Sequence, residues 1–254
     1  MLSAMVRVVF GIAVSWSALS ATAMATDKAP TPLLVELFTS EGCSSCPPAD
    51  ALLRTLDSTQ PIPGTQLIVL SEHVDYWDDL GWRDPFSSHQ FTQRQGVYAE
   101  RLHLATSYTP QMVVDGAIQF VGSDRARAAQ AFENAHSAAK VDLRISDITI
   151  EKGKLHAHIE SDALPEKAEI FVALALDHAQ SQVLRGENGG HRLEHVAVVR
   201  NLTSLGNAAK GSSVAKDADF KLDSSIAHYR LVAFLQEPSQ GKILGAATAR
   251  VEKK

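Results

Sequence analysis

The sequence of 254 residues predicts an α/β domain followed by an all-β domain that resembles a sandwich. Up to about residue 140, apolar strand-like runs alternate with segments whose apolar residues recur at helical spacing. Beyond residue 141, apolar residues recur at every second position, which is typical of half-buried strands. Hydrophobic residues make up 45% of the chain and charged residues 21%, so a disordered tail and a polytopic membrane protein are excluded.

Residues 1–25 are predicted to be a signal peptide that is not part of the fold. Arg7 is followed by an apolar run at residues 8–14, and the segment ends in Ala-Met-Ala at residues 23–25, the small-x-small pattern of a cleavage site. The apolar run is shorter than the about 20 residues of a membrane-spanning helix, although an uncleaved anchor is the alternative. We expect a periplasmic or secreted protein that starts at Thr26 and is not integral to the membrane after cleavage.

Residues 26–140 are predicted to form the α/β domain, in the order β-α-β-α-β-β-α. Two strands are expected to form a hairpin around Asp115-Gly116, a strong two-residue turn signal. The order of elements favours a mixed sheet flanked by helices. The strands are expected at residues 33–38, 67–70, 111–114 and 117–121, and the helices at residues 49–56, 86–104 and 124–139.

Residues 141–254 are predicted to form the all-β domain. Lys152-Gly153 and the segment 238–241 mark hairpin turns, and no long helical pattern interrupts the strands. About seven short strands without a helix favour a small β-sandwich. They are expected at residues 143–150, 155–159, 170–176, 194–202, 220–222, 229–235 and 243–251.

Charge and cysteine content narrow the classes of function. The chain has 24 Lys and Arg against 29 Asp and Glu, a net charge of −5, and no basic block. Nucleic-acid binding is therefore not expected, because neutralising phosphates needs clustered basic residues. Cys43 and Cys46 are the only cysteines, so a framework of several disulfides is excluded.

The Cys-x-x-Cys pair follows a buried strand and stands where the next helix is expected to begin. Unpaired N–H groups and the helix dipole at that position stabilise a thiolate, which lowers its pKa from about 8.5. We expect Cys43 to be the solvent-accessible nucleophile and Cys46 the buried, resolving thiol. A structural disulfide, half of a zinc site and chance are the alternatives, although no second Cys or His pair at zinc-site spacing is present.

Thr109-Pro110 stands directly before a strand-like run, and with the Cys-x-x-Cys pair it makes the chain similar to the thioredoxin superfamily. The resemblance implies a thioredoxin-like domain in which Pro110 is a cis-proline packed against the cysteines and Thr109 receives the substrate backbone. It also implies that Glu36 is a buried acid that relays a proton to Cys46. A strand-edge proline and a salt-bridged strand-end carboxylate are the alternatives.

A closer resemblance is to DUF1223, a family of exported bacterial proteins of unknown function. The shared features are Phe-Thr-Ser-Glu-Gly-Cys-Ser-Ser-Cys-Pro-Pro-Ala-Asp at residues 38–50, the long segment 73–86, the Thr-Pro before a strand, and Gly-Glu-Asn-Gly-Gly at residues 186–190. The likeness spans most of the chain. It implies a fold but no activity.

The segment from Glu72 to Phe86 is rich in aromatic residues and carboxylates and follows a buried strand. Because loops at a sheet edge commonly carry function, we expect this one to cover the thiols and shape substrate access; an ordinary surface loop is the alternative. Candidate substrate-binding residues are Trp77 and Trp82 here and Tyr108 and Thr109 before the hairpin.

His73 raises a metal hypothesis. Two thiolates and an imidazole suit Cu(I), and copper chaperones of the cytochrome-oxidase assembly type use a similar set. Those proteins separate their cysteines by three residues, whereas Cys43 and Cys46 are separated by two. His191 and His195, which flank the glycine-rich segment 186–190, are interpreted as surface residues, and the segment itself as a hairpin turn.

The sequence thus predicts an exported thiol–disulfide oxidoreductase that acts on protein or peptide thiols and disulfides and needs no cofactor. The alternatives are a copper-binding chaperone that uses Cys43, Cys46 and His73, and a binding module whose disulfide is structural.

Overall fold

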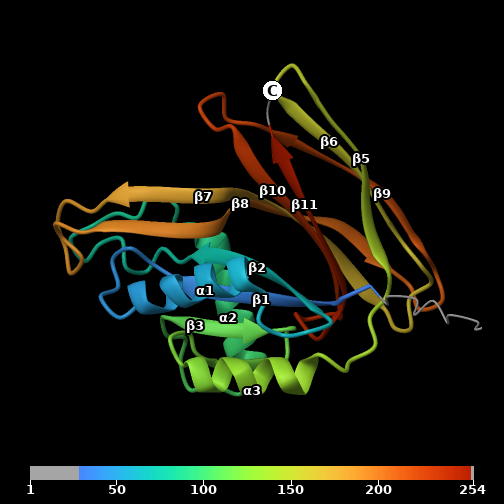
Figure 1. Cartoon of the computed structure of the whole chain (residues 1–254), viewed down its shortest axis with the longest axis horizontal. Helices are drawn as coiled ribbons and strands as arrows, with labels where there is room; N and C mark the ends of the chain where they lie inside the picture. The colour runs from blue at the N-terminus through green and yellow to red at the C-terminus, as the bar shows by residue number, and fades with distance from the viewer. Residues whose placement is uncertain (1–28, 253–254) are drawn as a thin grey trace, which may run out of the picture.

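The computed structural model describes residues 29–252, so the expected signal peptide and its cleavage point lie outside the described residues (Figure 1). The described chain is mostly β-structure. Its helices are α1 (Pro47–Thr59), α2 (His89–Arg101) and α3 (Arg125–Ala135). Its strands are β1 (Thr31–Thr39), β2 (Thr65–His73), β3 (Gln111–Val114), β4 (Ile118–Val121), β5 (Leu143–Glu151), β6 (Lys154–Ser161), β7 (Ala168–Gln182), β8 (Arg192–Ala208), β9 (Val214–Lys221), β10 (His228–Gln236) and β11 (Ile243–Glu252). No helix within these residues has the length and apolar character needed to cross a membrane.

The strands do not separate into the two predicted folds. One eight-stranded mixed sheet has the order β11-β10-β7-β8-β2-β1-β3-β4, and β5, β6 and β9 form a three-stranded sheet. Strands from both halves of the chain therefore share one sheet, joined where β2 runs parallel to β8 at Ser71 and Val198. The predicted α/β thioredoxin-like domain followed by a β-sandwich is wrong. Local periodicity located the strands, but it carries no information about which distant strand is the partner.

β1 lies inside the large sheet and is buried on both faces. Leu33, Val35 and Leu37 pack with α1 and α3, whereas Leu34 and Phe38 pack on the opposite face, with α2 and β10. This division follows from the alternation of side chains along a strand. Any side chain on β1 therefore faces either α1 or α2, and this alternation determines which residues can reach the cysteines.

α1 begins directly after the cysteine pair, with Cys46 at its N-cap and two prolines in its first turn. Prolines suit these positions because the first N–H groups of a helix have no partner within it. The apolar face of α1, which includes Leu52, Leu53 and Leu56, packs against the sheet strands β1, β2 and β8. The N-terminal end of α1 is thereby held between β1 and β8.

Two loops converge near this end of the molecule (Figure 1). The cover loop, residues 183–191, joins β7 to β8, and the tryptophan loop, residues 74–88, joins β2 to α2. The two loops are in contact, because a Cβ added to Gly81 would lie 3.2 Å from the Cα of Gly186. In Figure 1 the orange end of the β7–β8 hairpin accordingly lies beside the teal segment that follows β2.

Candidate functional site

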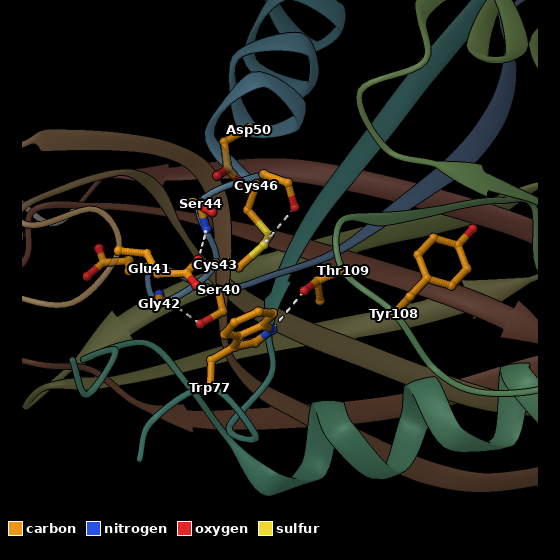
Figure 2. The surroundings of a disulfide bond; sticks show 12 residues. Ser40, Glu41, Gly42, Cys43, Ser44, Cys46, Asp50, Trp77, Tyr108 and Thr109 are labelled. Carbon is orange, nitrogen blue, oxygen red and sulfur yellow. Dashed lines mark hydrogen bonds between the residues drawn. A yellow bond between two sulfur atoms is a disulfide. The ribbon is translucent and has the colours of Figure 1, made fainter. Parts of the chain in front are cut away.

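Cys43 and Cys46 form a disulfide with a Cα–Cα distance of 5.4 Å (Figure 2). The cysteine turn that carries it, residues 40–46, links β1 to α1. Both cysteines are completely buried, at 0% exposure. The expectation that Cys43 is accessible to solvent while Cys46 is buried is therefore wrong for this disulfide state, because segments distant in the sequence close over the turn.

The cover loop lies over the cysteine turn and holds it through two consecutive side chains. The amide nitrogen of Asn188 donates to the carbonyl oxygens of Glu41, at 2.8 Å, and Cys43, at 3.0 Å. The backbone N–H of Ser44 donates to the carboxylate of Glu187 at 3.0 Å, which lowers the pKa of that carboxylate. The glycine-rich segment expected as a plain hairpin turn thus helps to bury the disulfide.

The tryptophan loop lies against the same turn. The indole N–H of Trp77 donates to the hydroxyl of Thr109 at 2.8 Å, and that of Trp82 donates to the carboxylate of Glu41 at 2.8 Å. A Cβ on Gly42 would lie 3.0 Å from the Cβ of Trp77, so the backbone there approaches the loop closely. Figure 2 shows Trp77 beside the disulfide and aimed at Thr109. The structure therefore brings both tryptophans to the cysteine turn.

A buried histidine links the two ends of the cysteine segment. His195 of β8 is 2% exposed; its Nε2 lies 3.2 Å from the Glu41 carboxylate and its Nδ1 lies 3.7 Å from that of Asp50. Burial lowers the pKa of His195, but interactions with Asp50 and Glu41 outweigh it and raise that pKa to about 10. His195 is therefore a buried cation between two carboxylates, and its interpretation as a surface residue is wrong.

His73 and Asp84 form a second buried pair beside this histidine. Their closest atoms, Nδ1 and Oδ2, are 2.7 Å apart, and the rings of His73 and His195 meet edge to face with centroids 4.7 Å apart. Burial raises the pKa of Asp84, but His73 and the backbone N–H groups of Glu41 and Phe86 lower it further, so the net shift is downward. Asp84 also accepts the N–H of Glu41 at 2.8 Å and so fixes the start of the cysteine turn.

Several polar atoms of this cluster make no hydrogen bond. Within residues 29–252, both carboxylate oxygens of Asp50, Nδ1 of His195 and Nε2 of His73 are buried without a hydrogen bond. Asp50 also lines a cavity of about 200 Å³ whose rim includes Pro47 and Arg54. Buried unpaired polar groups are costly and cluster at functional sites, so the ionisable groups beneath the disulfide are candidates for chemistry.

The metal hypothesis is not supported by a preformed site in the described residues. In the described part of the chain, no group of three or more His, Cys, Asp or Glu residues is arranged to hold a metal ion. His73 is completely buried and directs Nδ1 to Asp84.

Glu36 lies on the other side of β1. Its carboxylate accepts from Arg94 Nε at 2.7 Å and from the Tyr98 hydroxyl at 2.6 Å, both on α2. Its neighbour Leu37 faces α1, so the alternation of side chains directs Glu36 away from the helix that begins at Cys46. The structure therefore does not bring Glu36 to the cysteines; it anchors α2 through a buried ion pair.

The proline expected beside the cysteines is buried, and the Thr109-Pro110 peptide bond is cis. A Cβ on Gly122 would contact Pro110, Ala49 and Leu37, which places Pro110 close to the start of α1. Tyr108 differs: Figure 2 shows its ring pointing away from the disulfide, and its hydroxyl bonds to Gln119. Thr109 is thus at the cysteine turn, whereas the Tyr108 ring is not.

Sequence reasoning missed Glu41, Asp50, Asn188 and His195. The first two lie within the stretch 38–50, which was singled out for its cysteines and for the family resemblance. His195 had a signal, because it lies two positions after Leu193 in a strand-like run, and alternation puts the two on the same face. Asn188 lies in the shared segment 186–190, but nothing in the sequence indicated its role, since its partners are backbone atoms 145 and 147 residues away.

The fold and the cysteine site define a class of protein whose activity is not established. The chain belongs to the family described as "Protein of unknown function (DUF1223)", whose model matches residues 34–236. The expected membership in this family is confirmed. No curated protein matches the chain.

Among solved structures, a protein from Agrobacterium tumefaciens, determined by structural genomics, is similar at 25% identity and a TM-score of 0.66. The match covers 89% of this chain and 100% of that one. The sporulation control protein Spo0M of Bacillus subtilis matches at 14% identity over 46% of this chain and 49% of its own, with a TM-score of 0.29. A TM-score this low supports no inference about fold or function.

Proposed function

We propose that this protein exchanges thiols and disulfides with protein or peptide substrates through Cys43 and Cys46. One observation supports the proposal most: the disulfide stands at the N-terminal end of α1, beside buried ionisable groups several of whose polar atoms make no hydrogen bond. Such groups support proton transfer, and a helix N-terminus supports a thiolate.

A purely structural disulfide explains this arrangement less well. The bridge joins residues only three apart in sequence. In the loop-entropy description, closing so short a loop stabilises the fold by roughly 2 kcal/mol, less than the roughly 3 kcal/mol of a 15-residue loop. The apolar clusters on both faces of the large sheet are extensive by comparison.

In the proposed reaction, the thiolate of Cys43 attacks one sulfur of a substrate disulfide and the other substrate sulfur leaves as a thiolate, which takes up a proton. Cys46 then loses its proton and attacks the Cys43 sulfur of the mixed disulfide. The second substrate sulfur leaves, and the Cys43–Cys46 bond re-forms with the electron pair transferred to the substrate. The reverse sequence oxidises a substrate dithiol.

Asp50 is the carboxylate placed to take the proton of Cys46. It follows Cys46 by one helical turn, its backbone N–H donates to the Cys46 carbonyl at 3.1 Å, and its oxygens are free of hydrogen bonds to other described residues. Figure 2 shows Asp50 beside Cys46. This role was expected of Glu36, which faces α2.

Two further expectations support the proposal. The order of β1, cysteine turn, α1 and Thr109-Pro110 before β3 retains the motifs behind the expected resemblance to the thioredoxin superfamily, although the fold around them is not thioredoxin-like. Export to an oxidising compartment such as the periplasm, expected from residues 1–25, suits a protein that works through a disulfide.

Trapping tests the proposal. Cys46→Ser is expected to accumulate mixed disulfides with substrate proteins, because nothing then resolves the bond to Cys43, whereas Cys43→Ser accumulates few. Non-reducing gels of both variants, with the double variant as control, give the measurement. Equal trapping by both single variants, or by neither, contradicts the proposal; tight Cu(I) binding by the reduced protein without trapping favours the copper hypothesis instead.

A further inference from the structure

Three backbone groups of the cysteine turn are bonded by one distant segment. The carbonyls of Glu41 and Cys43 accept hydrogen bonds from the side-chain amide of Asn188, and the N–H of Ser44 donates a hydrogen bond to the side-chain carboxylate of Glu187. Both side chains belong to the cover loop, and they offer one amide donor and one carboxylate acceptor. A polypeptide backbone offers the same pair of functions, an N–H and a C=O.

The same segment is one of the parts that enclose the cysteine turn. Cys43 and Cys46 are completely buried, so exchange with a macromolecule requires the parts around them to move, and the cover loop, whose buried Asn188 bonds to the Cys43 carbonyl, is one of these parts. When the cover loop moves, the three backbone groups lose their partners. The carbonyls of the buried residues Glu41 and Cys43 then need replacements, whereas the N–H of Ser44 is exposed. An extended polypeptide can replace them while it brings its own sulfur to Cys43.

The two loops at the site expose large apolar side chains. Within residues 29–252 five large apolar side chains are exposed, and three of them lie on the two loops that close the site: Leu184 on the cover loop at 75%, and Leu80 and Tyr76 on the tryptophan loop at 61% and 40%. Single exposed apolar residues are common. Here they occur together with loops that meet at Gly81 and Gly186, which favours an apolar partner.

We propose that the substrate of this site is an extended, apolar polypeptide segment that displaces the cover loop and takes over the hydrogen bonds now made by Glu187 and Asn188. The inference rests on the proposed function, since it names the substrate of the same disulfide. Leu184, Leu80 and Tyr76 contact the apolar side chains of that segment. The cover loop and the substrate then compete for the same backbone groups of the cysteine turn.

A thiol-free probe separates binding from chemistry. The probe is a fluorescently labelled polypeptide, reduced and carboxymethylated so that it stays extended and has no thiols, and its binding to the full oxidised protein is measured by anisotropy. Asn188→Ala and Glu187→Gln, made separately, are expected to tighten binding several-fold to about tenfold, because each weakens the competing loop. Leu184→Ser with Leu80→Ser is expected to weaken binding.

The rate of reduction by a small reductant measures how often the cover loop exposes the sulfurs, without any contribution from polypeptide binding. A water-soluble phosphine is expected to reduce the disulfide of Asn188→Ala and Glu187→Gln faster by the same several-fold factor, because the sulfurs are uncovered more often. Matched controls are Asn134→Ala, an exposed asparagine on α3, and Asp79→Asn, an exposed carboxylate on the tryptophan loop. Both are expected to leave probe binding and the reduction rate unchanged.

Faster reduction without tighter probe binding overturns the inference, since the loop is then only a cover. Unchanged reduction and binding in both cover-loop variants also overturn it. Failure of the proposed function looks different: the probe binds as expected, but neither the wild type nor any variant catalyses disulfide exchange in a protein substrate.

Discussion

At the scale of the residue, the site combines one disulfide with a buried row of charged groups. His195 lies between Glu41 of the cysteine turn and Asp50 of α1, and His73 with Asp84 continues the cluster. Each of these side chains comes from a different part of the chain. Their effects on stability and on exchange can be separated by conservative substitutions.

The charge on His195 makes stability depend on pH. Its pKa is about 10 in the folded protein and about 6.5 when unfolded, so its contribution is complete below about pH 6.5 and is lost as the pH rises through about 10. We expect the free energy of unfolding to fall by about 4 kcal/mol between pH 6.5 and 10. Urea denaturation across that range measures it. His195→Gln should flatten the curve; an unchanged slope in that variant contradicts the assignment.

Asp50→Asn should slow the step in which Cys46 attacks the mixed disulfide. An amide cannot take the proton of Cys46, and general-base groups contribute about 10²–10⁴-fold to such steps. The decay of the mixed disulfide, followed by quenched-flow gels, is expected to slow by about 10²-fold, while alkylation of Cys43 in the reduced protein keeps its pH profile. If the mixed disulfide of Asp50→Asn decays at the wild-type rate, the proposed role of Asp50 is wrong.

Glu36→Gln should affect stability rather than exchange. The substitution leaves Arg94 as a buried cation with a weakened partner, and breaking a buried ion pair costs about 3–5 kcal/mol. Thermal or urea unfolding measures the loss. Because Glu36 faces α2, the rate of disulfide exchange per folded molecule is expected to stay at the wild-type value, and a specific loss of exchange in Glu36→Gln would restore its expected role beside Cys46.

At the scale of the element, the sequence predicted where helices and strands lie better than it predicted which strands pair with one another. The expected helices at residues 49–56, 86–104 and 124–139 correspond to α1, α2 and α3, and most later strands begin within two residues of the expected positions; β9 begins at Val214, six residues before the expected start at residue 220. Strand ends were missed where polar residues continue the ladder, as in β7 and β8, which run to 15 and 17 residues. Those extensions support the cover loop, so the part of the site that they form could not be predicted.

The tryptophan loop supplies an optical report of the redox state. Trp77 lies beside the disulfide and bonds to Thr109, so reduction of the neighbouring sulfurs should change its emission. We expect fluorescence to rise on reduction in the wild type and to change little in Trp77→Phe. Trp82→Phe, which alters the bond to Glu41 instead, serves as the comparison. Identical spectra for oxidised and reduced wild type would contradict the proximity.

At the scale of the whole molecule, the site belongs to both halves of the chain. Cysteines and Asp50 come from the first half, whereas Asn188 and His195 come from β7–β8 and its loop. The periodicity of each half indicates its strands correctly, but a sheet that joins β2 to β8 is a long-range pairing that no local pattern encodes. The cysteine pair was therefore predictable, and its burial was not.

A fragment of residues 26–140 is accordingly expected not to fold into a stable domain. It lacks β8, which pairs with β2 and packs against α1, and so exposes the apolar residues of both. Amide NMR spectra and urea denaturation are the measurements, with the mature full-length chain as control. Well-dispersed amide signals and a cooperative transition in the fragment would contradict this expectation.

The distance along the chain between the disulfide and its cover has a consequence for biosynthesis. Asn188 follows Cys43 by 145 residues, and a chain emerges from the ribosome with its N-terminus first. Until the segment around residue 188 has been made, its bonds to the cysteine turn cannot form, so the two thiols lack this part of their cover. We expect the disulfide to form more readily in that interval than after the β7–β8 hairpin has folded onto the turn.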